Sequence, residues 1–201
     1  MKNGMERIEV EMKKIQKGTY GYLAYKKRIE TLKSIFLLVL SLAIFVIGYV
    51  TTGTRKNLLT VVAVVSVLPA AKQITITILY YRYHSGNQET YKKIQSCIQN
   101  ATCLSDIVIT SYDKIAELLH ITIIGKTVIG YSEKAKTDEK HAAEFIKTTL
   151  EKNGCKGVSV KIYKDEKSYI TRIKEMQKNL AGERKESLEK EMAGIIKAIS
   201  I

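Results

Sequence analysis

A run of seventeen residues without a charged side chain, Ser34–Val50, restricts this chain more than any other feature. With the three residues that follow, it reaches about twenty residues, the length that crosses the hydrocarbon core of a bilayer. A buried helix of a soluble domain usually keeps one polar face, and here Ser34, Ser41 and Tyr49 alone interrupt the apolar side chains. The run therefore predicts a membrane-spanning helix over about residues 34–53.

A second apolar segment follows over about residues 58–81, and Lys72 interrupts it. In one placement the whole segment crosses the membrane with Lys72 inside it, at a cost of about 2–3 kcal/mol that about twenty apolar neighbours outweigh. In the other placement the membrane part ends near Ala71, Lys72 lies at headgroup level, and residues 74–81 follow the interface. We favour the first, which gives a transmembrane hairpin over residues 34–83.

Small and polar side chains recur along the second segment at the spacing of one helix face. They are Ala63, Ser66, Ala70, Gln73 and Thr77. Membrane helices associate through such stripes, because small residues let backbones approach and a Gln or Thr can hydrogen-bond across the contact. The stripe predicts a contact with the first spanning helix, with a second copy of the chain in a homo-oligomer, or with a partner membrane protein.

Pro69 and Lys72 mark an irregular point in the second segment. Pro69 is the single proline of the chain, and it predicts a kink about one turn before Lys72. Lys72 falls about 140° from the stripe at the helical period of 3.6 residues. One interpretation is an ion or substrate site in mid-membrane, and the other is a kinked anchor. No acidic residue lies between Glu30 and Glu89 to form a relay, which favours the anchor.

The basic residues predict the orientation. Residues 1–33 carry nine Lys and Arg against four Glu, whereas the linker 51–57 carries two Lys and Arg. Positive flanks stay in the cytoplasm, so we expect a cell-membrane protein with both termini inside and the linker outside. Four cations beside the first span, Lys26, Lys27, Arg28 and Lys33, form a basic collar that faces lipid.

The net charge of +13 favours lipid over nucleic acid as a partner. Residues 1–84 hold thirteen Lys and Arg against four acids, and residues 85–201 hold twenty against sixteen. The excess therefore lies beside the predicted membrane segments, where each basic residue near an anionic leaflet contributes about 1 kcal/mol. Binding to anionic headgroups accounts for this distribution, and nucleic acid is not an expected partner.

Residues 1–33 are predicted to be a basic amphipathic segment next to the membrane. Met5, Ile8, Met12 and Ile15 repeat at helical spacing, and the nearby tyrosines, Tyr20 among them, suit the aromatic belt of the interface. The three cysteines of the chain contain no C-x-x-C pair, and the three histidines are scattered. The sequence therefore predicts no metal site and no cofactor.

Residues 86–182 predict a small cytosolic domain of the α+β class. The expected order is helix, three strands, helix, strand, helix. The expected elements are a helix at 87–101, strands at 107–110, 115–124 and 127–132, a helix capped by Thr137, a strand at 158–163 and a helix from Glu166. Residues 183–201 form a C-terminal amphipathic helix that docks on the domain or on a partner.

This element order resembles the core of restriction-endonuclease-like nucleases. That resemblance implies an acidic residue at the start of the second strand and a Glu-x-Lys on the third, which together hold a divalent metal. Asp113 is loosely placed for the first position. Glu133 and Lys134 are adjacent rather than separated by one residue, so on a strand they point to opposite faces. The motif is missing, and any enzyme of this kind is expected to be degenerate.

Two stretches, KGTYGYLAYKKR (17–28) and TGTRKNLLTVVAVVSVLPAAK (52–72), are similar to small uncharacterised bacterial proteins with two membrane helices and a cytosolic tail domain. The resemblance implies the same architecture and brings no activity with it. We expect an integral membrane protein whose cytosolic domain acts as an interaction or regulatory module. The alternatives are a membrane-tethered, degenerate nuclease-like enzyme, and a small transport or channel component built on Pro69 and Lys72.

Overall fold

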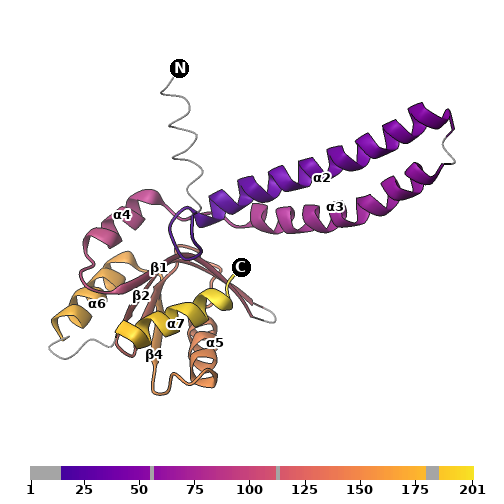
Figure 1. Cartoon of the computed structure of the whole chain (residues 1–201). Coiled ribbons are helices and arrows are strands. Elements are labelled where there is room, and N and C mark those ends of the chain that lie inside the picture. Colours follow the sequence, from indigo (N-terminus) through magenta and orange to yellow (C-terminus); the bar gives the residue numbers. More distant parts are fainter. Residues whose placement is uncertain (1–14, 55–56, 112–113, 180–185) are drawn as a thin grey trace. The chain divides into compact units, whose positions relative to one another are not determined.

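The computed structural model describes residues 15–54, 57–111, 114–179 and 186–201. They form two compact units: a helical hairpin, Leu23–His84, and an α+β unit made of Ser85–Ile201 with the residues up to Tyr22 (Figure 1). The predicted fold class is confirmed, since two long apolar helices are followed by a four-stranded sheet and its helices. The amphipathic helix predicted from Met5 to Ile15 lies almost entirely outside the described residues.

The hairpin consists of α2, Tyr22–Thr52, and α3, Leu58–Arg82. Both helices are long and apolar enough to cross a membrane. α2 begins twelve residues before the predicted span, because its charged first turns continue the helix without a break. Asn57 caps α3 by accepting the Thr60 N–H at 2.8 Å. Pro69 lies near the middle of α3, which bends along its length in Figure 1.

The α+β unit is built on one sheet in the order β1-β2-β3-β4, in which β1, β2 and β3 are antiparallel neighbours and β4 runs parallel to β3. Its elements along the chain are α4 (Gln88–Ser96), β1 (Thr102–Ser111), β2 (Lys114–Ile124), β3 (Thr127–Tyr131), α5 (Glu139–Lys152), β4 (Ser159–Tyr163), α6 (Glu166–Lys178) and α7 (Glu186–Ala198).

Helices cover both faces of the sheet, and each face has its own core (Figure 1). On one face, α5 and α7 bury Ile146 and Ile196 against the sheet. On the other, α4 and α6 bury Ile94 and Tyr169. The C-terminal helix α7 therefore docks on the α+β unit itself, through Met192, Ala193 and Ile196.

Three predicted element boundaries are wrong. The N-cap of α5 is Asp138, whose carboxylate accepts the His141 N–H, and not Thr137. Thr137 is instead buried, with its hydroxyl 2.9 Å from the Ser132 Oγ. The first helix of the unit ends at Ser96, five residues before its predicted end, and β1 begins at Thr102, five residues before the predicted strand.

The early part of β1 escapes prediction because its side-chain alternation changes phase. Leu104, Ile107 and Ile109 all belong to the same core face, although strict alternation would separate Leu104 from Ile107. Asp106 makes this shift with a φ of 52°, in the left-handed region that Asp tolerates better than most residues. The neighbouring strand changes phase as well, since Leu118 and Ile121 share one core.

Candidate functional site

The contact between α2 and α3 combines polar and small side chains. The Ser66 Oγ donates to the Ser41 Oγ at 2.8 Å, and the hydroxyl oxygens of Ser34 and Thr77 lie 2.7 Å apart. Ala63 and Ala70 are 4% and 0% exposed and let the two backbones approach. The structure thus brings the predicted stripe of α3 against α2 of the same chain.

Glu30 is the charged centre of this contact. It is 4% exposed, and its Oε1 accepts from Lys26 Nζ and Lys33 Nζ, each at 3.0 Å. Its Oε2 accepts from Gln73 Nε2 at 2.5 Å, and its backbone carbonyl accepts from the Thr77 hydroxyl at 2.9 Å. A buried carboxylate with several donors is stable where an unpaired one would be costly.

Sequence reasoning missed the half of the contact that α2 contributes. Glu30, Ser34, Ser41 and Gly48 are all buried and are separated by four, seven and seven residues, so they share one helix face. The pattern was present in the sequence. It was hidden because the two serines look like isolated interruptions of an apolar run until a partner helix shows that they lie on one stripe.

The two helices approach each other closely at Gly48, near the linker. A Cβ atom on Gly48 would lie 2.7 Å from the Leu59 Cβ, a distance that real Cβ atoms essentially never show. The Asn57 Nδ2 donates to the Gly48 carbonyl at 2.9 Å, so the residue that caps α3 also closes the turn onto α2. Glycine at this position is therefore a packing requirement.

The outer surface of the hairpin is apolar. Leu58, Leu68 and Val50 are 77%, 71% and 75% exposed, and most other large aliphatic residues of both helices also face outward. A soluble helical pair has the opposite arrangement, with apolar side chains inside and polar ones outside. Exposed apolar surface of this extent marks a region that contacts a membrane or another protein.

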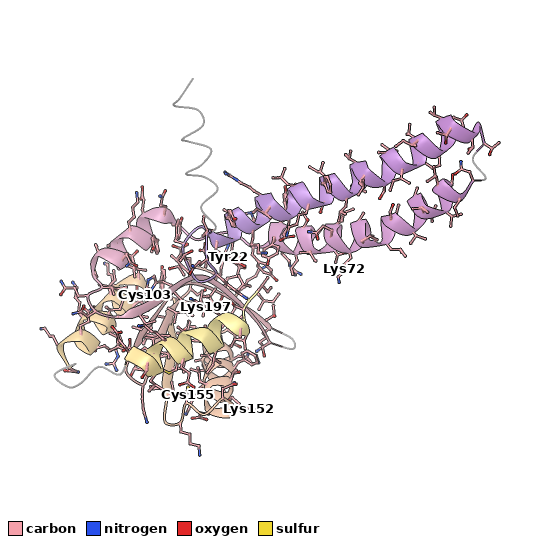
Figure 2. The ribbon with its side chains drawn as sticks, viewed as in Figure 1. Tyr22, Lys72, Cys103, Lys152, Cys155 and Lys197 are labelled. Atoms are coloured by element: carbon pink, nitrogen blue, oxygen red, sulfur yellow. The ribbon has the colours of Figure 1, made fainter. Side chains whose placement is uncertain are left out.

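Three of the four cations of the predicted basic collar interact with other side chains of the hairpin. Lys26 and Lys33 pair with Glu30, and Lys27 Nζ lies 4.0 Å above the centroid of the Tyr81 ring. Arg28 is exposed on α2. Lys72 is exposed on α3, and its side chain points away from α2 (Figure 2).

The α+β unit contains a buried His–Tyr pair beneath α6. His120 Nδ1 lies 3.0 Å from the Tyr169 hydroxyl, which also lies 2.9 Å from the Thr122 Oγ1. His120 and Tyr169 are both 0% exposed, and burial lowers the pKa of His120 to about 4 and raises that of Tyr169. Both side chains are therefore neutral at pH 7 and belong to the core.

Asp106 joins two distant segments of the α+β unit. Its Oδ2 accepts the Gly21 N–H at 2.7 Å and the Ser85 Oγ–H at 2.6 Å. The Tyr20 hydroxyl donates to the Gly86 carbonyl at 2.8 Å, and its ring stacks on Tyr91 at a centroid distance of 4.4 Å. The residues just before α2 and just after α3 are thus held on one strand, and Tyr20 is part of this core rather than of an interfacial belt.

The nuclease-like element order is present without its expected side-chain arrangement. Glu133 accepts the Asn87 N–H at 3.0 Å, whereas Lys134 Nζ lies 3.9 Å from Glu117, and Asp113 lies outside the described residues. Within the described ranges, no three His, Cys, Asp or Glu side chains are grouped so that they could hold a metal ion. Comparison with protein-family models, with curated proteins and with solved structures finds no match for this chain.

Proposed function

We propose that this is an integral membrane protein that crosses the bilayer twice and presents its α+β unit in the cytoplasm as an interaction or regulatory module. The observation that carries the proposal is the inverted polarity of the hairpin. Glu30, Ser34, Ser41 and Gln73 face the helix–helix contact, and the large aliphatic side chains face outward. Lipid is the solvent that suits this distribution.

The orientation rests on charge. The ends of α2 and α3 that adjoin the α+β unit carry Lys26, Lys27, Arg28 and Arg82, whereas the linker carries two cations. Positive residues are retained on the cytoplasmic side during insertion. Both termini and the α+β unit are therefore assigned to the cytoplasm, with residues 53–57 on the opposite side of the membrane.

An interaction role is supported by what the buried polar groups of the α+β unit do. The Glu189 carboxylate accepts the Gly125 N–H at 2.9 Å and the Thr102 hydroxyl at 2.8 Å, which fixes α7 to the sheet. Ser132 donates to the Glu117 carbonyl at 2.7 Å. Together with Asp106, these groups hold segments of the fold in place, as expected of a rigid module that presents a surface.

Labelling of full-length protein in intact cells tests the topology. A cysteine introduced by Thr54→Cys is expected to react with a membrane-impermeant maleimide added from outside. The native Cys97 and Cys103, both partly exposed in the α+β unit, provide the control, because they should react only after permeabilisation. Labelling of residue 54 only after permeabilisation, or release of the protein from membranes by alkaline washing, would contradict the proposal.

Crosslinking in native membranes tests the interaction role. Full-length protein and a variant that ends at Ser85 are treated with a lysine-reactive crosslinker, and captured proteins are identified by mass spectrometry. We expect a defined partner that the truncated variant, which retains the hairpin, does not capture. Metal-dependent cleavage of DNA or RNA by the purified protein, lost in Asp113→Ala, would instead favour the nuclease alternative.

A further inference from the structure

Lys72 is a cation on the lipid-facing side of the hairpin. Its side chain is exposed and points away from α2 (Figure 2), and within the part of the chain that the structure describes it has no hydrogen bond, ion pair or ring contact. The other lysines at this end of the hairpin differ, because Lys26 and Lys33 are paired with Glu30 and Lys27 lies on Tyr81. In a hairpin that crosses the bilayer, the charge of Lys72 is therefore compensated by water or by lipid headgroups and not by a group of the hairpin.

The register between the two helices fixes the level of Lys72. Ser66 faces Ser41, and one residue beyond Lys72 the Gln73 side chain reaches Glu30. Along an antiparallel pair with the same rise in both helices, these two contacts and the Ser34–Thr77 pair on average place Lys72 opposite Ser34, to within about one and a half helical turns. Lys33, the last charged residue of α2, lies at the same level.

The length of α2 indicates which of its residues lies at the edge of the hydrocarbon core. From Ser34 to the end of α2 at Thr52 the helix is about 28 Å long, which matches a hydrocarbon core of about 30 Å. If the hydrocarbon reached the level of Lys26, the spanning part of α2 would be about 40 Å long. That placement would also put every member of the basic collar and Glu30 in hydrocarbon, at a cost in free energy of several kcal/mol.

We propose that Lys72 binds the phosphate of an anionic phospholipid in the cytoplasmic leaflet and marks, with Lys33, the inner boundary of the hydrocarbon. This inference rests on the proposed function, since it requires that the hairpin crosses the bilayer. An ammonium group on a four-carbon stem reaches from the outer face of α3 to the headgroup phosphates. The helix continues past this boundary to Arg82, so the Glu30–Gln73–Thr77 network lies at headgroup level. This placement replaces the one that the sequence favours, in which Lys72 lies within the hydrocarbon.

The absence of tryptophan from the chain allows a direct measurement of depth. Leu68 and Ile78 are both exposed on α3, at 71% and 64%, and flank Lys72. Leu68→Trp and Ile78→Trp variants of the full-length protein are placed in vesicles that contain phospholipids brominated near the ends of their acyl chains. We expect strong fluorescence quenching at position 68 and little at position 78, with emission from position 78 shifted to longer wavelength.

Equal quenching at both positions would overturn the inference, because Lys72 would then lie within the hydrocarbon. Quenching at neither position would contradict membrane insertion, and with it the proposed function. The two failures are thus distinguishable.

Lipid selectivity tests the phosphate contact itself. In the Leu68→Trp background, quenching by brominated phosphatidylglycerol is compared with quenching by brominated phosphatidylcholine. We expect a preference of about fivefold for phosphatidylglycerol at this position, lost in Lys72→Gln. Lys147→Gln, which removes an exposed lysine of α5, is the matched control and should keep the preference. An unchanged preference in Lys72→Gln would overturn the assignment of Lys72 to the lipid phosphate.

Discussion

The hydroxyl of Ser85 donates a hydrogen bond of 2.6 Å to the Asp106 carboxylate, across 21 residues of sequence. The same oxygen accepts the Gly21 N–H at 2.7 Å. Gly21 immediately precedes α2, and Ser85 follows α3 by three residues, so one side chain on β1 holds the chain on both sides of the hairpin. Asp106 is 3% exposed, which makes its hydrogen bonds important to the unit.

Replacing Asp106 by Asn should destabilise this junction by about 1–3 kcal/mol, because the two hydrogen bonds then end on a neutral amide oxygen instead of a carboxylate oxygen. Asn tolerates the left-handed φ of Asp106, so the substitution isolates the carboxylate, whereas Asp106→Ala adds backbone strain. Hydrogen exchange of residues 15–22 in the full-length protein is expected to accelerate. The control is Asp165→Asn, which replaces one helix N-cap residue by another and should leave exchange unchanged.

The hairpin contact should depend on the coupling of Glu30 with Gln73. Interhelical hydrogen bonds in membranes contribute about 0.6–2 kcal/mol, so Glu30→Gln and Gln73→Ala should each weaken the contact. The double variant is expected to weaken the helix–helix contact by less than the sum of the two single losses in free energy, since both substitutions remove the same interaction. Disulfide trapping between cysteines at positions 41 and 66 reports the closed hairpin. Strict additivity of the two losses would show that the pair is not coupled.

Two neighbouring alanines of α3 should differ in their tolerance of a larger side chain. Ala70 is 0% exposed in the helix contact, whereas Ala71 is exposed. Ala70→Leu should cost about 1–3 kcal/mol through overpacking, and Ala71→Leu should be neutral. The hydrodynamic behaviour and gel mobility of the two variants in detergent would reveal the difference. The opposite ranking would mean that the packed face of α3 is assigned incorrectly.

His120 should make the α+β unit less stable in acid. Its pKa is lowered from 6.5 to about 4 by burial, so between these values the unfolded chain binds more protons than the folded one. The free energy of unfolding is therefore fully retained above about pH 6.5 and falls as the pH approaches 4, by about 2 kcal/mol at pH 5. Hydrogen exchange of β2 at pH 7.5 and 5, corrected for intrinsic rates, measures the change. His120→Gln should abolish this contribution, while His141→Gln, on the surface of α5, should leave it intact.

Glu189 should be essential for the docking of α7. Its side chain is 0% exposed and accepts the Gly125 N–H and the Thr102 hydroxyl. Glu189→Ala leaves the Gly125 N–H without this acceptor and is expected to lower the free energy of unfolding by about 2 kcal/mol. Glu191→Gln changes an exposed acid on the same helix and should have no measurable effect. Denaturant unfolding followed by circular dichroism compares the two variants.

Periodicity was sufficient to predict most elements of the fold. The charge-free run that begins at Ser34, the Gly125–Lys126 turn between β2 and β3, and the start of α6 at Glu166 all follow from local composition and spacing. Local patterns failed where a contact outside its own helix or strand decides what a residue does. The start of β1 was missed because Asp106 shifts the alternation, and Thr137 resembles a cap although it bonds Ser132.

The sequence by itself determined that two helices of this chain are long and apolar enough to cross a membrane, because the lengths of apolar runs and the positions of charges are local properties. It also determined that α3 has one face of small and polar side chains. The tertiary structure decided which surface that face contacts, and it brought Glu30 to Gln73 and Lys72 to the level of Ser34. These relationships depend on the register between two helices, which no single segment encodes, since contacts such as those of Gly48 with Leu59 and Asn57 join residues of both helices.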